Sequence, residues 1–177
     1  MKNILLLFSI VLLGFSCSPH LSPFTQELYQ SNHWTVDDLK QIQFYLSKDI
    51  VLYRKVSKGE STIHGGKIKI KKGQKIEEII IEAGTPGVVL FSPKKDRLAV
   101  SFESNGENKF LIFGPNPKAG KRYVLLAKDW KKHKGKISYD DKVYFTDSES
   151  AYASLLVDLK KVRKVSRTKH KASGRKL

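Results

Sequence analysis

Cysteine is nearly absent from this chain of 177 residues, in which Cys17 is the only one. A single cysteine cannot form a disulfide bond within the chain, so burial and backbone hydrogen bonding must hold the fold together. Acidic residues are also scarce, because 17 Asp and Glu stand against 33 Lys and Arg, and the formal net charge is +16. This excess of positive charge predicts an anionic partner or an anionic surface.

Recognisable catalytic and metal-binding patterns are missing as well. The sequence contains no nucleophile elbow, phosphate loop or dinucleotide fingerprint. Its five histidines are far apart in the sequence, and none stands at a spacing typical of a metal site; they are His20, His33, His64, His133 and His170. We therefore expect a protein that is not an enzyme and that needs neither a metal nor a cofactor.

The chain begins with a short apolar segment. Lys2 precedes the apolar run from Ile4 to Leu13, and the small residues Gly14 and Ser16 follow it. A basic residue, a short apolar stretch and small residues before a junction are the parts of an export signal. The run is shorter than the ~20 apolar residues that a membrane-spanning helix needs. We therefore expect residues 1–16 to be a signal peptide.

The segment from Met1 to about Ser18 resembles the signal region of bacterial lipoproteins, in which a peptidase cuts before a cysteine that receives lipid. That family usually has leucine three residues before the cysteine, where this chain has Gly14, and Phe15 is bulkier than the usual residue. The pattern resembles the relaxed signals of the Bacteroidota. The resemblance implies that Cys17 carries palmitate or related acyl chains, of which a stable anchor needs at least two. An ordinary secretory signal that ends near Ser16 is the alternative.

The residues after Cys17 bear on the destination of the protein. In the lipoprotein class, acidic residues directly after the cysteine often redirect sorting, and none occurs here. The resemblance thus implies a location on the outer membrane, facing the periplasm. Pro19 and Pro23 favour an extended path, so we expect residues 17–24 to form a tether. Nucleic acid is then not an expected partner, which leaves anionic lipid, the cell wall or an envelope protein.

Residues 25–47 are predicted to be helical. Thr35 is a suitable N-cap, and Asp37 and Asp38 follow in the first turn, where acidic side chains complement the helix dipole. Leu39, Ile42 and Leu46 would share one helical face. We expect this helix to end near Ser47 and to pack against the domain that follows.

Residues 48–165 show the alternation and turn signals of an antiparallel β domain. The connections are too short for helical crossovers, which predicts a barrel or a sandwich. Turns are expected at Gly65-Gly66, Lys72-Gly73-Gln74, Pro93 to Asp96, Ser104 to Gly106 and Asp140-Asp141. The predicted strands are Ile50 to Val56, Ser61 to His64, Lys67 to Lys71, Glu77 to Ala83, Gly87 to Ser92, Arg97 to Glu103, Lys109 to Gly114, Arg122 to Ala127, Lys136 to Tyr139, Lys142 to Thr146 and Ser154 to Val165.

The C-terminal segment is basic and contains no acidic residue. We expect residues 166–177 to form a disordered tail, and the segment as a whole to bind an anionic surface or to keep a strand edge from pairing with neighbouring molecules. Its candidate binding residues are Lys160, Lys161, Arg163, Lys164, Arg167, Lys169, Lys171, Arg175 and Lys176.

A second candidate anionic site lies in the loop from Lys128 to Lys136. Trp130 stands beside Lys131, Lys132 and Lys134, so the loop could offer stacking together with charge. Trp130 could equally belong to the core.

The sequence thus predicts a non-enzymatic lipoprotein of the cell envelope that binds an anionic component or serves as an accessory subunit of an envelope assembly. The alternative is an envelope hydrolase, whose carboxylates would come together from separate strands of the β domain.

Overall fold

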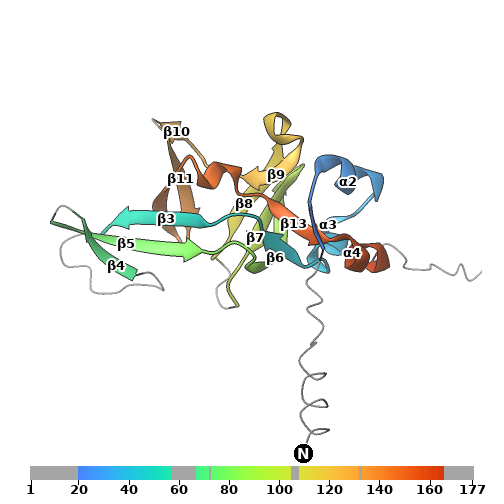
Figure 1. Ribbon diagram of the computed structural model, residues 1–177, viewed down its shortest axis with the longest axis horizontal. Coiled ribbons are helices and arrows are strands. Elements are labelled where there is room, and N and C mark those ends of the chain that lie inside the picture. The colour runs from blue at the N-terminus through green and yellow to red at the C-terminus, as the bar shows by residue number, and fades with distance from the viewer. Residues whose placement is uncertain (1–19, 57–66, 72, 105–107, 132, 166–177) are drawn as a thin grey trace, which may run out of the picture.

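The computed structural model describes residues 20–56, 67–71, 73–104, 108–131 and 133–165, with the backbone alone at 71 and 163–165 (Figure 1). The described chain is mainly β, and its strands form two antiparallel sheets that share one hydrophobic core. The predicted mainly β class and the antiparallel pairing are therefore confirmed. Residues 1–19, with Cys17, and residues 166–177 lie outside the described residues, as do the predicted strand at 61–64 and the turn at Gly65-Gly66.

The first sheet has seven strands in the order β1-β13-β2-β6-β7-β8-β9. Two isolated bridges, Thr25 with Arg122 and Val124 with Ser154, bring β9 back towards the chain next to β1 and β13. These are single residue pairs, so the described strands do not form a closed barrel, and a sandwich fits the arrangement. The strands are β1 (Leu21–Pro23), β2 (Phe44–Leu46), β6 (Pro86–Lys94), β7 (Arg97–Ser101), β8 (Leu111–Asn116), β9 (Arg122–Leu125) and β13 (Leu155–Asp158).

The second sheet has six strands in the order β10-β11-β12-β3-β5-β4. Strands β4 and β5 reach one end of the molecule, whereas the α-helices gather at the opposite end (Figure 1). The strands are β3 (Ile50–Lys55), β4 (Lys67–Lys71), β5 (Gln74–Ile81), β10 (Trp130–Lys131), β11 (Lys134–Tyr139) and β12 (Lys142–Asp147).

Short helices cover the end of the seven-stranded sheet. Thr35 begins one of them with a capping box, in which its Oγ1 accepts from the Asp38 N–H and the Asp38 carboxylate accepts from the Thr35 N–H at 2.8 Å. This confirms the predicted helix start. The helical segments are α2 (Gln26–Ser31), α3 (Val36–Lys40), α4 (Leu159–Val165) and the two 3-10 turns η1 (Pro117–Ala119) and η2 (Ser150–Tyr152).

Both sheets contribute side chains to the core. Phe24 is fully buried and packs against the rings of Phe44 and Tyr123, with centroids 5.1 and 4.8 Å away. Leu52 and Phe113, from opposite sheets, are also fully buried. Because no disulfide is possible, burial of this apolar surface supplies most of the stabilisation.

The turn between β11 and β12 shows how local sequence sets the register of a hairpin. Asp140 and Asp141 both have positive φ, at 50° and 58°, and Tyr139 faces Lys142 across the two-residue loop. Two consecutive positive φ values match the right-handed twist of the flanking strands, and Asp tolerates them better than most residues. The predicted turn at Asp140-Asp141 is confirmed.

The predicted helix over residues 35–47 is wrong beyond Lys40. Phe44, Tyr45 and Leu46 form β2, which pairs with β13 on one side and with β6 on the other. The two outer residues are buried and the middle one is partly exposed, as in a strand with one covered face. Tertiary pairing with two neighbours therefore outweighs the local helical pattern.

The last predicted strand, Ser154 to Val165, is also wrong at its end. Strand β13 stops at Asp158, whose Oδ1 accepts the N–H of Lys160 at 3.0 Å, and α4 follows. Leu159 and Val162 are three residues apart, and both pack on the core. That spacing suits a helical turn and would put the two side chains on opposite faces of a strand.

The predicted tether of residues 17–24 is wrong at its C-terminal part, from Leu21 to Phe24. Leu21–Pro23 form β1 and pair with β13 in the register Leu21 with Asp158. Phe24 directly afterwards is a core residue. Among the described residues, Leu21 is therefore the first that belongs to a sheet.

Candidate functional site

The basic residues predicted to bind an anionic surface begin at the end of the molecule where the chain enters the fold. Leu21 is the register partner of Asp158, and α4 starts at the next residue after Asp158. Lys160 and Lys161 are exposed on the first turn of α4. Of the other predicted residues of this set, Arg163 and Lys164 lie in α4 with their side chains outside the described part, and Arg167, Lys169, Lys171, Arg175 and Lys176 lie outside the described residues.

The residues of the predicted site around Trp130 lie on two faces of the sheet. Trp130 pairs with Gly135 and so lies on the face of the sheet that covers the core, whereas Lys131 and Lys134 pair with each other on the opposite face. A Cβ added to Gly135 would lie 2.9 Å from Cη2 of Trp130, so the indole lies against that glycine. The indole remains 42% exposed. Lys132 lies outside the described residues.

The face of the six-stranded sheet turned away from the core is partly apolar, and we call it the outer face. Ile80 and Val143 are each 45% exposed on it, and Phe145 is 41% exposed. Phe145 is the register partner of Tyr53, and the two ring centroids are 6.3 Å apart. Exposed apolar groups that lie together in this way are typical of a binding surface.

Lysines stand on both sides of these apolar residues. Successive register partners across β11, β12, β3, β5 and β4 are Lys136, Phe145, Tyr53, Glu78 and Lys67. The Lys134 ammonium lies 5.8 Å from the centre of the Tyr53 ring, a cation–π arrangement. The outer face therefore carries an apolar centre between two basic edges, and the exposed Lys55 of β3 lies beside that centre on the same face.

The acidic groups of the outer face are already engaged within it. The Tyr53 hydroxyl donates to Asp147 Oδ1 at 3.0 Å, and the ammonium of Lys69 pairs with the Glu78 carboxylate. Partial burial, and then the bond to Asp147, raises the pKa of Tyr53 to about 12. Tyr53 thus remains a neutral donor at all physiological pH values.

The sequence pattern gave only part of this surface. The predicted strand from Lys67 to Lys71 is present as β4, and its alternation puts Lys67 and Lys69 on the outer face. In β12, however, Val143, Tyr144, Phe145 and Thr146 are apolar or β-branched on both faces, so the sequence does not say which face is covered. The signal that could have indicated the outer face is the presence of apolar residues on both faces of β3, β5 and β12.

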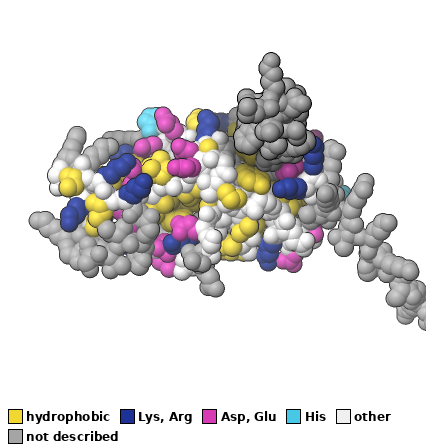
Figure 2. All heavy atoms as spheres, turned by 60° about the horizontal axis from the view of Figure 1, so that its bottom comes forward, with side chains coloured by type: hydrophobic (Ala, Val, Ile, Leu, Met, Phe, Trp, Pro, Cys, Tyr) yellow, Lys and Arg dark blue, Asp and Glu magenta, His cyan; other side chains and the backbone are white. Residues whose placement is uncertain are grey.

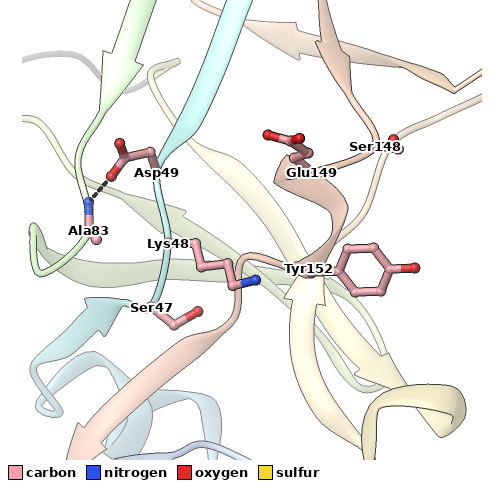
Figure 3. A pocket seen from close by; sticks show the side chains of 7 residues that line it. All are labelled: Ser47, Lys48, Asp49, Ala83, Ser148, Glu149 and Tyr152. Carbon is pink, nitrogen blue, oxygen red and sulfur yellow. Dashed lines mark hydrogen bonds between the residues drawn. The ribbon is translucent and has the colours of Figure 1, made fainter.

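A hollow of about 590 Å³ opens among three connections, which join β2 to β3, β5 to β6 and β12 to β13. Figure 3 shows Asp49 and Glu149 on opposite sides of it, with Lys48 between them and Tyr152 on the Glu149 side. Asp49 Oδ1 accepts the N–H of Ala83 at 2.7 Å, and both carboxylates are exposed. The hollow offers polar contacts to a ligand. A carboxylic acid that stays protonated for catalysis usually owes this to burial, whereas the carboxylates of Asp49 and Glu149 are exposed. It is lined by Ser47, Lys48, Asp49, Ala83, Ser148, Glu149 and Tyr152.

Neither a metal-binding cluster nor a membrane-spanning helix occurs among the described residues. Within residues 20–165, apart from the gaps given above, no three His, Cys, Asp or Glu side chains gather in a way that could hold a metal ion. The same stretch contains no helix with the length and hydropathy needed to cross a bilayer.

Comparisons with protein-family models, with curated proteins and with solved structures find no match to this chain. The chemistry of the sites must therefore be argued from the residues themselves.

Proposed function

We propose that the protein is a lipid-anchored, non-enzymatic component of the cell envelope, held by Cys17 on the periplasmic side of the outer membrane. Its basic C-terminal segment binds the anionic surface next to the anchor. The observation that carries this proposal is the pairing of Leu21 with Asp158, because it joins the start of the fold to the start of that segment.

The length of chain between Cys17 and Leu21 supports the proposal. Only Ser18, Pro19 and His20 separate the two residues. An extended chain covers at most ~3.6 Å per residue, so Leu21 lies within about 14 Å of a lipid-modified Cys17. The end of the domain that contains β1 and α4 is then held close to the membrane surface.

The charge of this end suits such a position. Lys160 and Lys161 are exposed, and the chain continues to Leu177 without an acidic residue. A Lys or Arg near an anionic bilayer contributes about 1 kcal/mol, and the effect fades over a Debye length of roughly 8 to 10 Å. A domain that started far from the bilayer would gain little from these charges.

Vesicle binding by charge-reversal variants tests the proposal. The full-length protein should bind vesicles that contain phosphatidylglycerol, and Lys160→Glu/Lys161→Glu should reduce binding at least fivefold at low salt. The control is Lys128→Glu/Lys131→Glu, which changes charge equally near β10, away from α4 (Figure 1). Equal loss of binding in both variants would mean that net charge alone is responsible, and the proposed position of α4 at the membrane would fail.

A further inference from the structure

The outer face of the six-stranded sheet lies away from the proposed membrane-facing end. Strand β4 and the neighbouring part of β5 occupy one end of the long axis, whereas α4 lies at the other (Figure 1). A bilayer that meets the molecule at its α4 end therefore does not also cover β4. The occupant of the outer face must come from the surrounding solution.

The apolar centre of this face is formed by side chains of three adjacent strands. Ile80 comes from β5, Tyr53 from β3, and Val143 and Phe145 from β12. Hydrophobic side chains also reach the surface among charged ones in Figure 2, which views the molecule from one side. Aromatic and aliphatic groups that are rimmed by polar ones are the usual core of a protein–protein interface.

The basic edges define the chemistry of the occupant. Lys134 and Lys136 border the apolar centre on the β11 side, and Lys67 borders it on the β4 side, where the neighbouring Lys69 is paired with Glu78. The carboxylates of Glu78 and Asp147 are bound within the face, so they are poorly placed to receive the lysines of a second copy. An occupant that brings its own carboxylates to both edges satisfies this arrangement.

We propose that the outer face docks an acidic segment of another protein, with apolar side chains in its middle and Asp or Glu on both sides. Neighbouring strands lie about 4.8 Å apart, so the five-strand row from Lys136 to Lys67 spans roughly 19 Å. At ~3.3 Å per extended residue, about six residues bridge the two basic edges. This proposal goes beyond membrane attachment, and it rests on the proposed position of α4 at the membrane only for the exclusion of a lipid surface as the occupant.

Selection from a random peptide library on the purified full-length protein tests the docking proposal. We expect the selected twelve-residue peptides to combine Asp and Glu with aromatic or aliphatic residues. Phe145→Ser and Lys67→Glu/Lys136→Glu should each weaken binding of a selected peptide at least tenfold. Val88→Ser is the matched control, because Val88 is 41% exposed on β6 of the other sheet, and it should leave binding unchanged.

Several results would overturn the docking proposal. These are the selection of no peptides, the selection of peptides without acidic residues, and equal binding by Phe145→Ser. Dimerisation of the protein that Phe145→Ser abolishes would identify a second copy as the occupant. A further result would show that the outer face is merely an electrostatic surface. In that case phosphatidylglycerol vesicles would displace the peptide, and Phe145→Ser would bind the vesicles as well as the unchanged protein does. Since none of these readouts involves lipidation, they do not depend on the outcome of the vesicle experiment with the α4 variants.

Discussion

Arg54 Nε donates to Glu77 Oε2 at 2.5 Å, across a register in which the two residues face each other on β3 and β5. The Glu77 side chain is completely buried, and that of Arg54 is only 11% exposed. The guanidinium also lies 5.8 Å from the ring centre of Tyr144, which comes from β12. Three neighbouring strands thus meet around one buried ion pair.

Breaking this ion pair should destabilise the protein strongly. Glu77→Leu and Arg54→Met should each lower the free energy of unfolding by about 3 to 5 kcal/mol, because each leaves one buried charge without its partner. The double variant should recover part of that loss. Urea unfolding of the four proteins measures the coupling, and a double variant equal to the sum of the single ones would contradict it.

Two buried tyrosines should respond in opposite ways to loss of the hydroxyl. Tyr123 Oη is buried and has no hydrogen-bond partner among the described residues, so Tyr123→Phe should leave stability unchanged or raise it by up to ~1 kcal/mol. The Tyr139 hydroxyl donates to the Glu103 carboxylate, and Tyr139→Phe should cost about 1.5 to 3 kcal/mol. Thermal and urea unfolding measure the stability of both variants. An equal change in stability for Tyr123→Phe and Tyr139→Phe would refute this assignment.

Stability should fall at alkaline pH. The pKa of Tyr53 is raised to about 12 in the folded protein, so the unfolded chain loses the phenolic proton first, near the ordinary value of 10.0. Its contribution is complete below pH 10 and is lost as the pH rises from 10 to about 12. The free energy of unfolding, measured between pH 9 and 11.5, should decline less steeply in Tyr53→Phe. An identical decline would show that Tyr53 is not involved, although burial also raises the pKa values of Tyr123 and Tyr139.

Gly135→Ala should disturb the packing of Trp130. The added Cβ would approach Ala127 Cβ to 2.7 Å and the indole to 2.9 Å, both closer than carbon atoms tolerate. We expect a loss of about 1 to 3 kcal/mol and a shift of the tryptophan emission to longer wavelength, since the displaced indole meets more water. Unchanged emission and stability would place the indole elsewhere.

The sequence predicted those parts of the fold that local chemistry determines. The capping box at Thr35 and the turn at Asp140-Asp141 depend on nearby residues, and both are present. Residues 44–46 were predicted to be helical, because their pairing partners on β6 and β13 are distant in the chain. Local periodicity does not contain that information.

The binding surfaces were predictable only in part. The strand from Lys67 to Lys71 was predicted, but the register of β10, which puts Trp130 on the face opposite to Lys131 and Lys134, could not be derived from the sequence. The pairing of Phe145 with Tyr53 and the burial of Glu77 against Arg54 depend on strand order. Strand order depends on which residues distant in the chain pair, and no short motif in this sequence specifies it.

Attachment through Cys17 is tested most directly by mass spectrometry of the N-terminal peptide of the protein isolated from its native membranes. We predict that the peptide begins at Cys17 and carries a diacylglyceryl group, with or without a further acyl chain. A peptide that retains residues 1–16, or one that has an unmodified thiol at Cys17, would contradict the proposed function.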